Sequence, residues 1–139
     1  MLKQSIRHSH GLTLIEMMVV VAIIGILAGI AWPLFDAQQM KSRRAEAVSA
    51  ATRINSEITN FFSDNFVYTG YTINATITGG LKYYTAAVVI PTASTYTITL
   101  TPTGVQAADA ECQNYTLDNV GRKANTGTST SVANCWGAN

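Results

Sequence analysis

Three carboxylates that could do chemistry together, Asp109, Glu111 and Asp118, fall close to one another in the sequence. Neighbouring carboxylates perform acid–base chemistry in glycoside hydrolases, and carboxylate oxygens are ligands that calcium prefers. The same residue types also solvate loops and turns, because their side chains hydrogen-bond to nearby backbone groups. We expect loop and turn solvation here. The sequence contains no glycine-rich phosphate-binding loop.

A fourth carboxylate, Glu16, opens an apolar run that extends from Met17 to Phe35. As a helix, residues 12–35 would extend about 36 Å, which exceeds the roughly 30 Å hydrocarbon core of a bilayer. We therefore expect a membrane-spanning helix. A charged side chain in such a segment costs at least about 2.5 kcal/mol, so Glu16 is predicted to have a functional partner.

The sequence from Gly11 to Ala28, GLTLIEMMVVVAIIGILA, resembles the amino-terminal signature of type IV prepilins. This resemblance implies that prepilin peptidase cuts between Gly11 and Leu12 and that the new amino terminus at Leu12 is N-methylated. The family usually has phenylalanine at the position of Leu12, and we expect cleavage to tolerate this apolar exchange. Cleavage as an ordinary signal peptide, at Gly29 and Ala31, is the alternative, but the apolar run is too long for one.

Cleavage after Gly11 would give Glu16 a partner. The new amine at Leu12 is positive and lies one helical turn from Glu16, and burying the two charges as a pair avoids most of the cost of burying either alone. The pair could form within one subunit or, as the resemblance implies for filaments, with the amine of a neighbouring subunit. Cleavage would also remove the only two histidines, His8 and His10. We therefore expect no enzyme activity, no cofactor and no metal site.

The charges of the chain nearly balance once the leader is removed. The formal net charge is +1, and loss of Lys3 and Arg7 leaves seven basic against eight acidic residues. Nucleic acid is therefore an unexpected partner, because broad electrostatic binding needs clustered basic residues. We interpret Lys41, Arg43 and Arg44 as a solvated helix face near lipid headgroups or acidic neighbours in a fibre, and not as a ligand site.

The only two cysteines, Cys112 and Cys135, are predicted to form a disulfide, because an exported domain enters an oxidising compartment. The disulfide would close a loop of about 24 residues and contribute roughly 3 kcal/mol in the chain-entropy model. Free or metal-bound thiols are the alternative. Two isolated cysteines supply too few ligands for zinc.

Gly25, Gly29 and Pro33 interrupt the apolar helix and predict a zone of reduced helix stability. The resemblance implies that this zone loses helical order in filaments, which lets subunits pack and the fibre stretch. Close packing between helices is the rival role, because Gly25 and Gly29 have the spacing of a small-residue contact motif. Beyond Phe35, apolar residues recur at three- and four-residue steps as far as Phe62, which predicts an amphipathic helix.

The remaining sequence predicts a small antiparallel sheet. Tyr68 and Tyr71 fall in a connecting loop and are expected to pack on the helix. Strands are predicted at 81–90, 96–101 and 115–120, with a turn at 91–94, and a short fourth strand is predicted to run into Cys135 and Trp136. The predicted fold class is α+β, a pilin fold with a long N-terminal helix packed against an antiparallel β-sheet and a C-terminal disulfide-bounded region. Its expected divisions are a cleaved leader (1–11), a hydrophobic helix half (12–35) and a globular head (36–139), the head comprising an amphipathic helix (36–62), a loop (63–80) and the sheet and disulfide region (81–139).

The C-terminal part resembles the E-type minor pilins of twitching pili. The resemblance is carried by the segment from Tyr96 to Gly104, by the residues around Cys112 and Tyr115, and by Cys135-Trp136. It implies a structural subunit that helps initiate or joins a type IV pilus for twitching motility, adhesion or surface attachment. A major pilin, a competence pilin for DNA uptake and a type II secretion pseudopilin are the alternatives.

The same resemblance implies the partners and the location of the chain. The expected partners are other pilin subunits, prepilin peptidase, the inner-membrane assembly platform and, before assembly, membrane lipid. The leader is expected in the cytoplasm and the head in the periplasm, with the subunit in an extracellular fibre after assembly. If the chain captures DNA, Arg122 and Lys123 are the basic pair in the head that would contact it.

Overall fold

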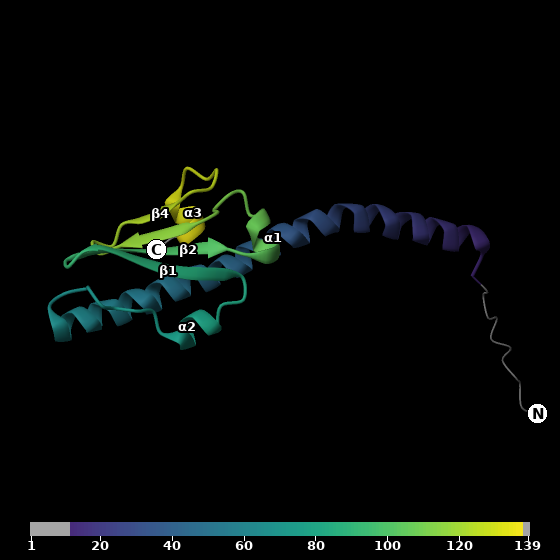
Figure 1. Ribbon diagram of the computed structural model, residues 1–139. Helices are drawn as coiled ribbons and strands as arrows, with labels where there is room; N and C mark the ends of the chain where they lie inside the picture. Colours follow the sequence, from purple (N-terminus) through teal and green to yellow (C-terminus); the bar gives the residue numbers. More distant parts are fainter. Residues whose placement is uncertain (1–11, 138–139) are drawn as a thin grey trace, which may run out of the picture. The chain divides into compact units, whose positions relative to one another are not determined.

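Figure 1 shows a computed structural model of the chain, which describes residues 12–137, with the side chains of residues 31–34 outside the description. The chain divides into two units, residues 1–37 and 38–139, and each is described by itself. Helix α1 (Leu14–Asn65) passes through both. By length and composition, α1 is long and apolar enough to cross a membrane.

In the first unit, α1 presents apolar side chains in every direction. Its large apolar residues between positions 14 and 30, and Phe35, are exposed, from Leu14 at 78% to Val20 at 43%. The helix is continuous through Gly25, Gly29 and Pro33. A helix that is apolar all round needs lipid or other protein around it, as the sequence predicted.

In the second unit, one stripe of α1 forms half of the core. Ala47, Ala51, Ile54 and Ile58 recur at three- and four-residue steps and are fully buried. The helix ends at Asn65, three residues beyond the predicted end. Phe66 then adopts a left-handed conformation with φ of 59°, and its N–H donates to the carbonyl of Phe62 at 2.7 Å.

The other half of the core is a four-stranded antiparallel sheet of order β1-β2-β3-β4, which lies over the second half of α1 (Figure 1). In β2, Tyr96, Ile98 and Leu100 are buried, while the threonines between them are half-buried, as the alternating sequence predicted. Val88 of β1 and Leu117 of β3 are the register partners of Ile98. The strands are β1 (Tyr84–Thr92), β2 (Thr95–Pro102), β3 (Tyr115–Asp118) and β4 (Lys123–Asn125).

Short elements connect the helix and the strands. The predicted loop at 63–80 contains α2 (Ala75–Gly79), and η1 (Gly104–Ala108) follows β2. Tyr68 and Tyr71 do pack on the helix: Tyr68 lies against Phe62 with ring centroids 4.5 Å apart, and Tyr71 contacts Phe61 edge-on at 5.7 Å.

The predicted fourth strand at Cys135 and Trp136 was wrong. These residues belong to the short helix α3 (Val132–Trp136), and the fourth strand is β4. Successive side chains of a strand point to opposite faces, whereas Cys135 and Trp136 are both buried. A helical turn allows both: Cys135 forms the predicted disulfide with Cys112, and the indole of Trp136 donates to the Ala124 carbonyl at 3.0 Å.

Candidate assembly and interaction sites

Glu16 closes a capping box at the start of α1. The backbone N–H of Glu16 donates to the hydroxyl of Thr13 at 3.3 Å, and the carboxylate of Glu16 accepts from the backbone N–H of Thr13 at 3.5 Å. Two backbone donors that the helix would otherwise leave unpaired are thereby satisfied. The pattern Thr13-x-x-Glu16 is a known sequence signal for a helix start, so it could have been found without the structure.

The capping box directs the Glu16 carboxylate toward the N-terminal end of the helix. The N–H that it accepts belongs to Thr13, the residue directly after Leu12. Leu12 and Glu16 are both exposed in the single chain. Gly11, the residue before the predicted cut, lies outside the described residues. The pairing of Glu16 with an amine at Leu12 stays a prediction.

The two glycines of the predicted weak zone are open on the single chain. A Cβ added at Gly25 or at Gly29 would meet no atom within 4 Å. The backbone of Pro33 is helical as well. Loss of helical order at this zone concerns the fibre and stays a prediction.

Arg44 is buried, and its interpretation as part of a solvated face was wrong. The side chain is 7% exposed and donates twice to Asp109, from Nε to Oδ2 and from Nη2 to Oδ1, both at 2.7 Å. Nη2 also donates to Glu111 Oε2 at 2.7 Å. Arg44 falls on the stripe of α1 that carries Ala47 and Ala51, and therefore points into the head.

Asp109 is buried as well, so the expectation that it solvates a loop was wrong too. Besides Arg44, it accepts from Gln106 Nε2 at 3.0 Å and from the backbone N–H of Cys112 at 3.4 Å. The hydrogen bonds to Asp109 raise the pKa of Arg44 above its usual range, against the opposing effect of burial. This network ties α1 to the segment that leads into the disulfide.

The network also decides the chemistry of the carboxylate cluster. Asp109, Glu111 and Cys112 have potential metal-ligand atoms within 4.8 Å of one another. The sulfur of Cys112 is in the disulfide, however, and Arg44 already forms ion pairs with both carboxylates. A calcium ion would have to displace the guanidinium. The cluster is a structural ion pair.

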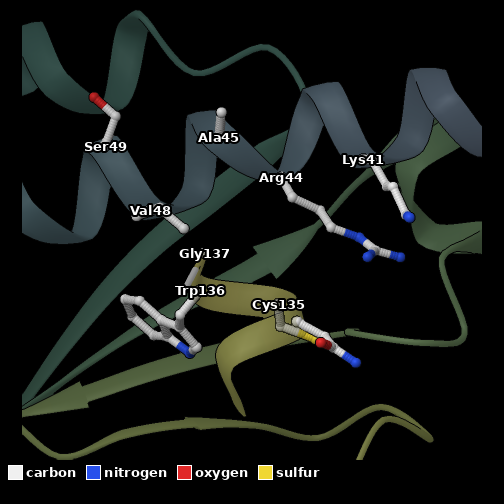
Figure 2. A pocket seen from close by; sticks show the side chains of 9 residues that line it. Lys41, Arg44, Ala45, Val48, Ser49, Cys135, Trp136 and Gly137 are labelled. Carbon is white, nitrogen blue, oxygen red and sulfur yellow. The ribbon is translucent and has the colours of Figure 1, made fainter. Parts of the chain in front are cut away.

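A groove of about 460 Å³ runs between α1 and α3 beside this network. Figure 2 shows Lys41 and Arg44 extending from α1, with Trp136 and Cys135 on α3 opposite them. Lys41 is exposed. Of the three basic residues that follow the apolar segment, Lys41 therefore fits the predicted solvated face best.

Asp118 does serve a turn, as predicted. Its Oδ1 accepts from the backbone N–H groups of Val120 and Arg122, and its Oδ2 accepts from Arg122 Nε at 2.7 Å. Desolvation raises the pKa of Asp118, but the hydrogen bonds from Arg122 and Val120 together outweigh it and hold the pKa below its ordinary value. Arg122 is therefore already paired, and the ammonium of Lys123 lies 5.5 Å from the Trp136 ring centroid.

A second basic cluster was missed by the sequence reasoning. The guanidinium carbon of Arg43 lies 4.7 Å from the ring centroid of Tyr83, and the ammonium of Lys82 lies 5.7 Å from the same centroid. Arg43 and Lys82 are far apart in the sequence and come together because the segment just before β1 is hydrogen-bonded to Glu46 of α1. No local sequence signal predicts this contact.

Two family models match the chain. One is described as the prokaryotic N-terminal methylation motif and matches residues 6–32, a range that includes Gly11, Leu12 and Glu16. The other is described as type IV minor pilin ComP, DNA uptake sequence receptor, and matches residues 33–116, more than half of the chain. The chain belongs to the type IV pilins.

Relatives and a solved structure agree with this assignment. Fimbrial protein EcpC of Eikenella corrodens is 38% identical over 112 residues, which cover 76% of this chain and 69% of EcpC. The type IV major pilin protein PilA of Myxococcus xanthus is 43% identical over 63 residues, which cover 45% of this chain and only 29% of PilA. The non-core minor pilin PilV of Neisseria meningitidis has the same fold, with a TM-score of 0.53 at 17% identity over 72% of this pilin and 96% of that chain.

This pilin is thus a structural subunit and not an enzyme, and it associates with other pilin subunits in a pilus. The apolar half of α1 and the methylation motif fit a membrane-anchored precursor that later enters a fibre.

Proposed function

We propose that this pilin is a minor subunit of a type IV pilus, which helps initiate or joins the fibre for twitching motility, adhesion or surface attachment. The fibre role rests on the first half of α1, where the described large apolar side chains are between 43% and 78% exposed. Such a surface is stable only in lipid or against other subunits. The match of residues 33–116 to a minor pilin model supports the minor-subunit role. The precursor is held in the inner membrane with its head in the periplasm, and the assembly platform moves it into the fibre.

Maturation creates the charge pair between Glu16 and the amine of Leu12, which sets the position of the subunit in the fibre. Prepilin peptidase cuts between Gly11 and Leu12, and the new amine at Leu12 is methylated. The capping box supports this proposal, because it already holds the carboxylate of Glu16 beside the backbone of Thr13, the neighbour of Leu12. In the fibre, Glu16 then compensates the amine of its own or of a neighbouring subunit.

The open glycines support a contact role for the weak zone. Because an added Cβ at Gly25 or Gly29 meets nothing within the single chain, any close approach at these positions must come from another molecule. Together with Pro33, they would also let α1 lose helical order in the fibre.

Deletion of the gene, followed by electron microscopy and a motility assay, tests the proposal. Loss or strong reduction of pili and of retraction-dependent motility is expected, with this subunit present in sheared fibres at a small fraction of the most abundant pilin. A dominant amount in the fibres would make it a major pilin. Normal pili and motility would falsify both assignments.

Substitution of Glu16 by alanine tests the registering role separately. Glu16→Ala should leave processing by the peptidase intact and reduce the amount of subunit in sheared fibres. Asp64→Ala is the matched control, because it removes one exposed carboxylate at the far end of α1. Equal incorporation of the two variants would rule out the charge pair.

A second candidate function is DNA capture, which the match to the ComP family favours. The basic pair predicted for that role, Arg122 and Lys123, lies beyond the matched residues 33–116, and Asp118 already neutralises Arg122. Arg122→Gln with Lys123→Gln should abolish binding of duplex DNA if the pair is the contact. Unchanged binding would place the DNA contact elsewhere in the head.

A further inference from the structure

Arg43 and Lys82 place two positive charges beside one aromatic ring. The guanidinium carbon of Arg43 is 4.7 Å and the ammonium nitrogen of Lys82 is 5.7 Å from the centroid of Tyr83. Tyr83 is half-buried and packs against the core, whereas Lys82 is exposed. The ring therefore contacts one partly buried cation and one exposed cation.

Glu46 fixes this arrangement. Its Oε1 accepts from the backbone N–H groups of Lys82 and Tyr83, both at 2.8 Å, and so attaches the start of β1 to α1. Arg43 precedes Glu46 by three residues, which places both on the same side of the helix. The backbone of Lys82 and Tyr83 is consequently fixed against the turn of α1 that carries Arg43.

Among the ion pairs of residues 12–137, none includes Arg43 or Lys82, and the nearby carboxylate of Glu46 accepts from backbone N–H groups instead. The ion pairs found there join Arg44 to Asp109 and Glu111, and Arg122 to Asp118. The Nε of Arg43 is buried and has no hydrogen-bond partner. A buried donor without an acceptor is costly, and two adjacent positive charges repel each other. An external anion with several acceptor oxygens would offset this positive charge.

We propose that Arg43, Tyr83 and Lys82 form a binding site for the phosphate of an anionic phospholipid headgroup. A guanidinium presents a planar fork of donors that matches phosphate oxygens, and an ammonium adds a second point of charge. Tyrosine is favoured where membrane and water meet. The inference rests on the proposed membrane-held precursor, in which Arg43 follows Phe35, the last residue of the apolar run, by only eight residues.

A single phosphate group suits this site better than a DNA backbone does. Binding to duplex DNA draws on a row of phosphates and a matching row of cations. Here two cations lie near one ring, and the carboxylate of Glu46 accepts from the backbone N–H of Tyr83. Basic residues that follow a membrane helix attract anionic lipid, each by about fivefold in affinity.

Native mass spectrometry of the full-length mature chain in a neutral detergent tests the site. Phosphatidylglycerol is titrated against the chain, with phosphatidylcholine as the zwitterionic comparison. We expect one tightly bound phosphatidylglycerol, and an affinity about 25-fold lower in the variant with Arg43→Gln and Lys82→Gln. Arg53→Gln with Lys123→Gln is the matched control, because it removes the same charge from exposed positions elsewhere on the head.

Tyr83→Leu is a second variant, which keeps both charges and removes the ring that both cations contact. It should lower the affinity for phosphatidylglycerol by a smaller factor than Arg43→Gln with Lys82→Gln does. Equal affinity of the charge variant and its matched control would overturn the proposal. Displacement of phosphatidylglycerol by inorganic phosphate or by a short DNA duplex, at equal phosphate concentration, would also overturn the proposal. The amount of each variant in the cell membrane fraction is measured separately. A chain that is absent from the membrane would contradict the proposed function, whereas a chain that is present but does not bind the lipid would contradict only this site.

Discussion

Arg44 and Asp109 form a two-point ion pair, with two N–O distances of 2.7 Å, between residues 65 positions apart in the chain. Both side chains are nearly fully buried. The pair joins α1, the element that would enter the fibre core, to the segment before the disulfide. The same two oxygens of Asp109 also accept from Gln106 Nε2 and from the backbone N–H of Cys112, and these added hydrogen bonds favour a single geometry.

Removing one partner of this pair should destabilise the head strongly. Asp109→Asn leaves the guanidinium of Arg44 buried with only Glu111 as a counter-charge, and breaking a buried pair in this way costs about 3 kcal/mol or more. Chemical denaturation of the full chain in detergent micelles measures the loss. Asp118→Asn, which removes half of an exposed pair, should leave the midpoint nearly unchanged. Equal effects of the two variants would contradict this account.

Gly127 should tolerate no side chain. A Cβ there would overlap the carbonyl oxygen of Glu111 and lie 2.6 Å from the nitrogen of Cys112. Both are backbone atoms, which cannot avoid the Cβ by a change of side-chain rotamer. We expect Gly127→Ala to lower the free energy of unfolding by about 3 kcal/mol. Gly79→Ala is the control, because an added Cβ at Gly79 meets no atom within 4 Å. A stable Gly127→Ala variant would show that the loop near the disulfide can shift.

The disulfide should contribute to the free energy of unfolding by an amount similar to the loss expected for Gly127→Ala. In the chain-entropy model, the bond between Cys112 and Cys135 contributes about 3 kcal/mol, because it closes a loop of roughly 24 residues in the unfolded chain. Cys112→Ser with Cys135→Ser should lose that amount in chemical denaturation. A reducing agent should lower the stability of the unmodified chain to the same level and leave the double variant unaffected.

The elements with a repeating pattern were predictable from the sequence. The helix stripe at Ala47, Ala51, Ile54 and Ile58 repeats every three or four residues, and β2 alternates over its whole length. Such periods record which face is buried. The short elements have no period, so the sequence around Cys135 does not distinguish a helical turn from a strand.

Burial of Arg44 could also have been predicted from the helix period. Arg44 lies three residues before Ala47 and seven before Ala51, on the buried stripe, whereas Lys41 and Arg43 precede it in an apparently uniform basic run. The basic side chains of this run favour a solvated face, whereas the helix period places Arg44 on the buried one. The partner, Asp109, and the approach of Lys82 to Arg43 depend on how distant segments pack, and no local pattern encodes either.

Tyr71 should ionise at unusually high pH. Its burial, followed by the charge of Glu57 and the hydrogen bond to that carboxylate at 3.3 Å, raises the pKa of Tyr71 from 10.0 to about 12. The folded state therefore holds this proton more tightly than the unfolded state. Between about pH 10 and pH 12, the unfolded chain binds fewer protons, so the contribution of Tyr71 to stability is lost as the pH rises through this window.

Titration of the tyrosine ring by NMR checks this, with Glu57→Gln as the informative variant. Removing the carboxylate should lower the pKa of Tyr71, while burial keeps it above the ordinary value. Asp64→Asn is the matched control, because it neutralises a carboxylate on the same helix that makes no contact with Tyr71 among the hydrogen bonds of residues 12–137. If Glu57→Gln and Asp64→Asn shift the pKa equally, the raised value arises from burial alone and Glu57 has no specific part in it.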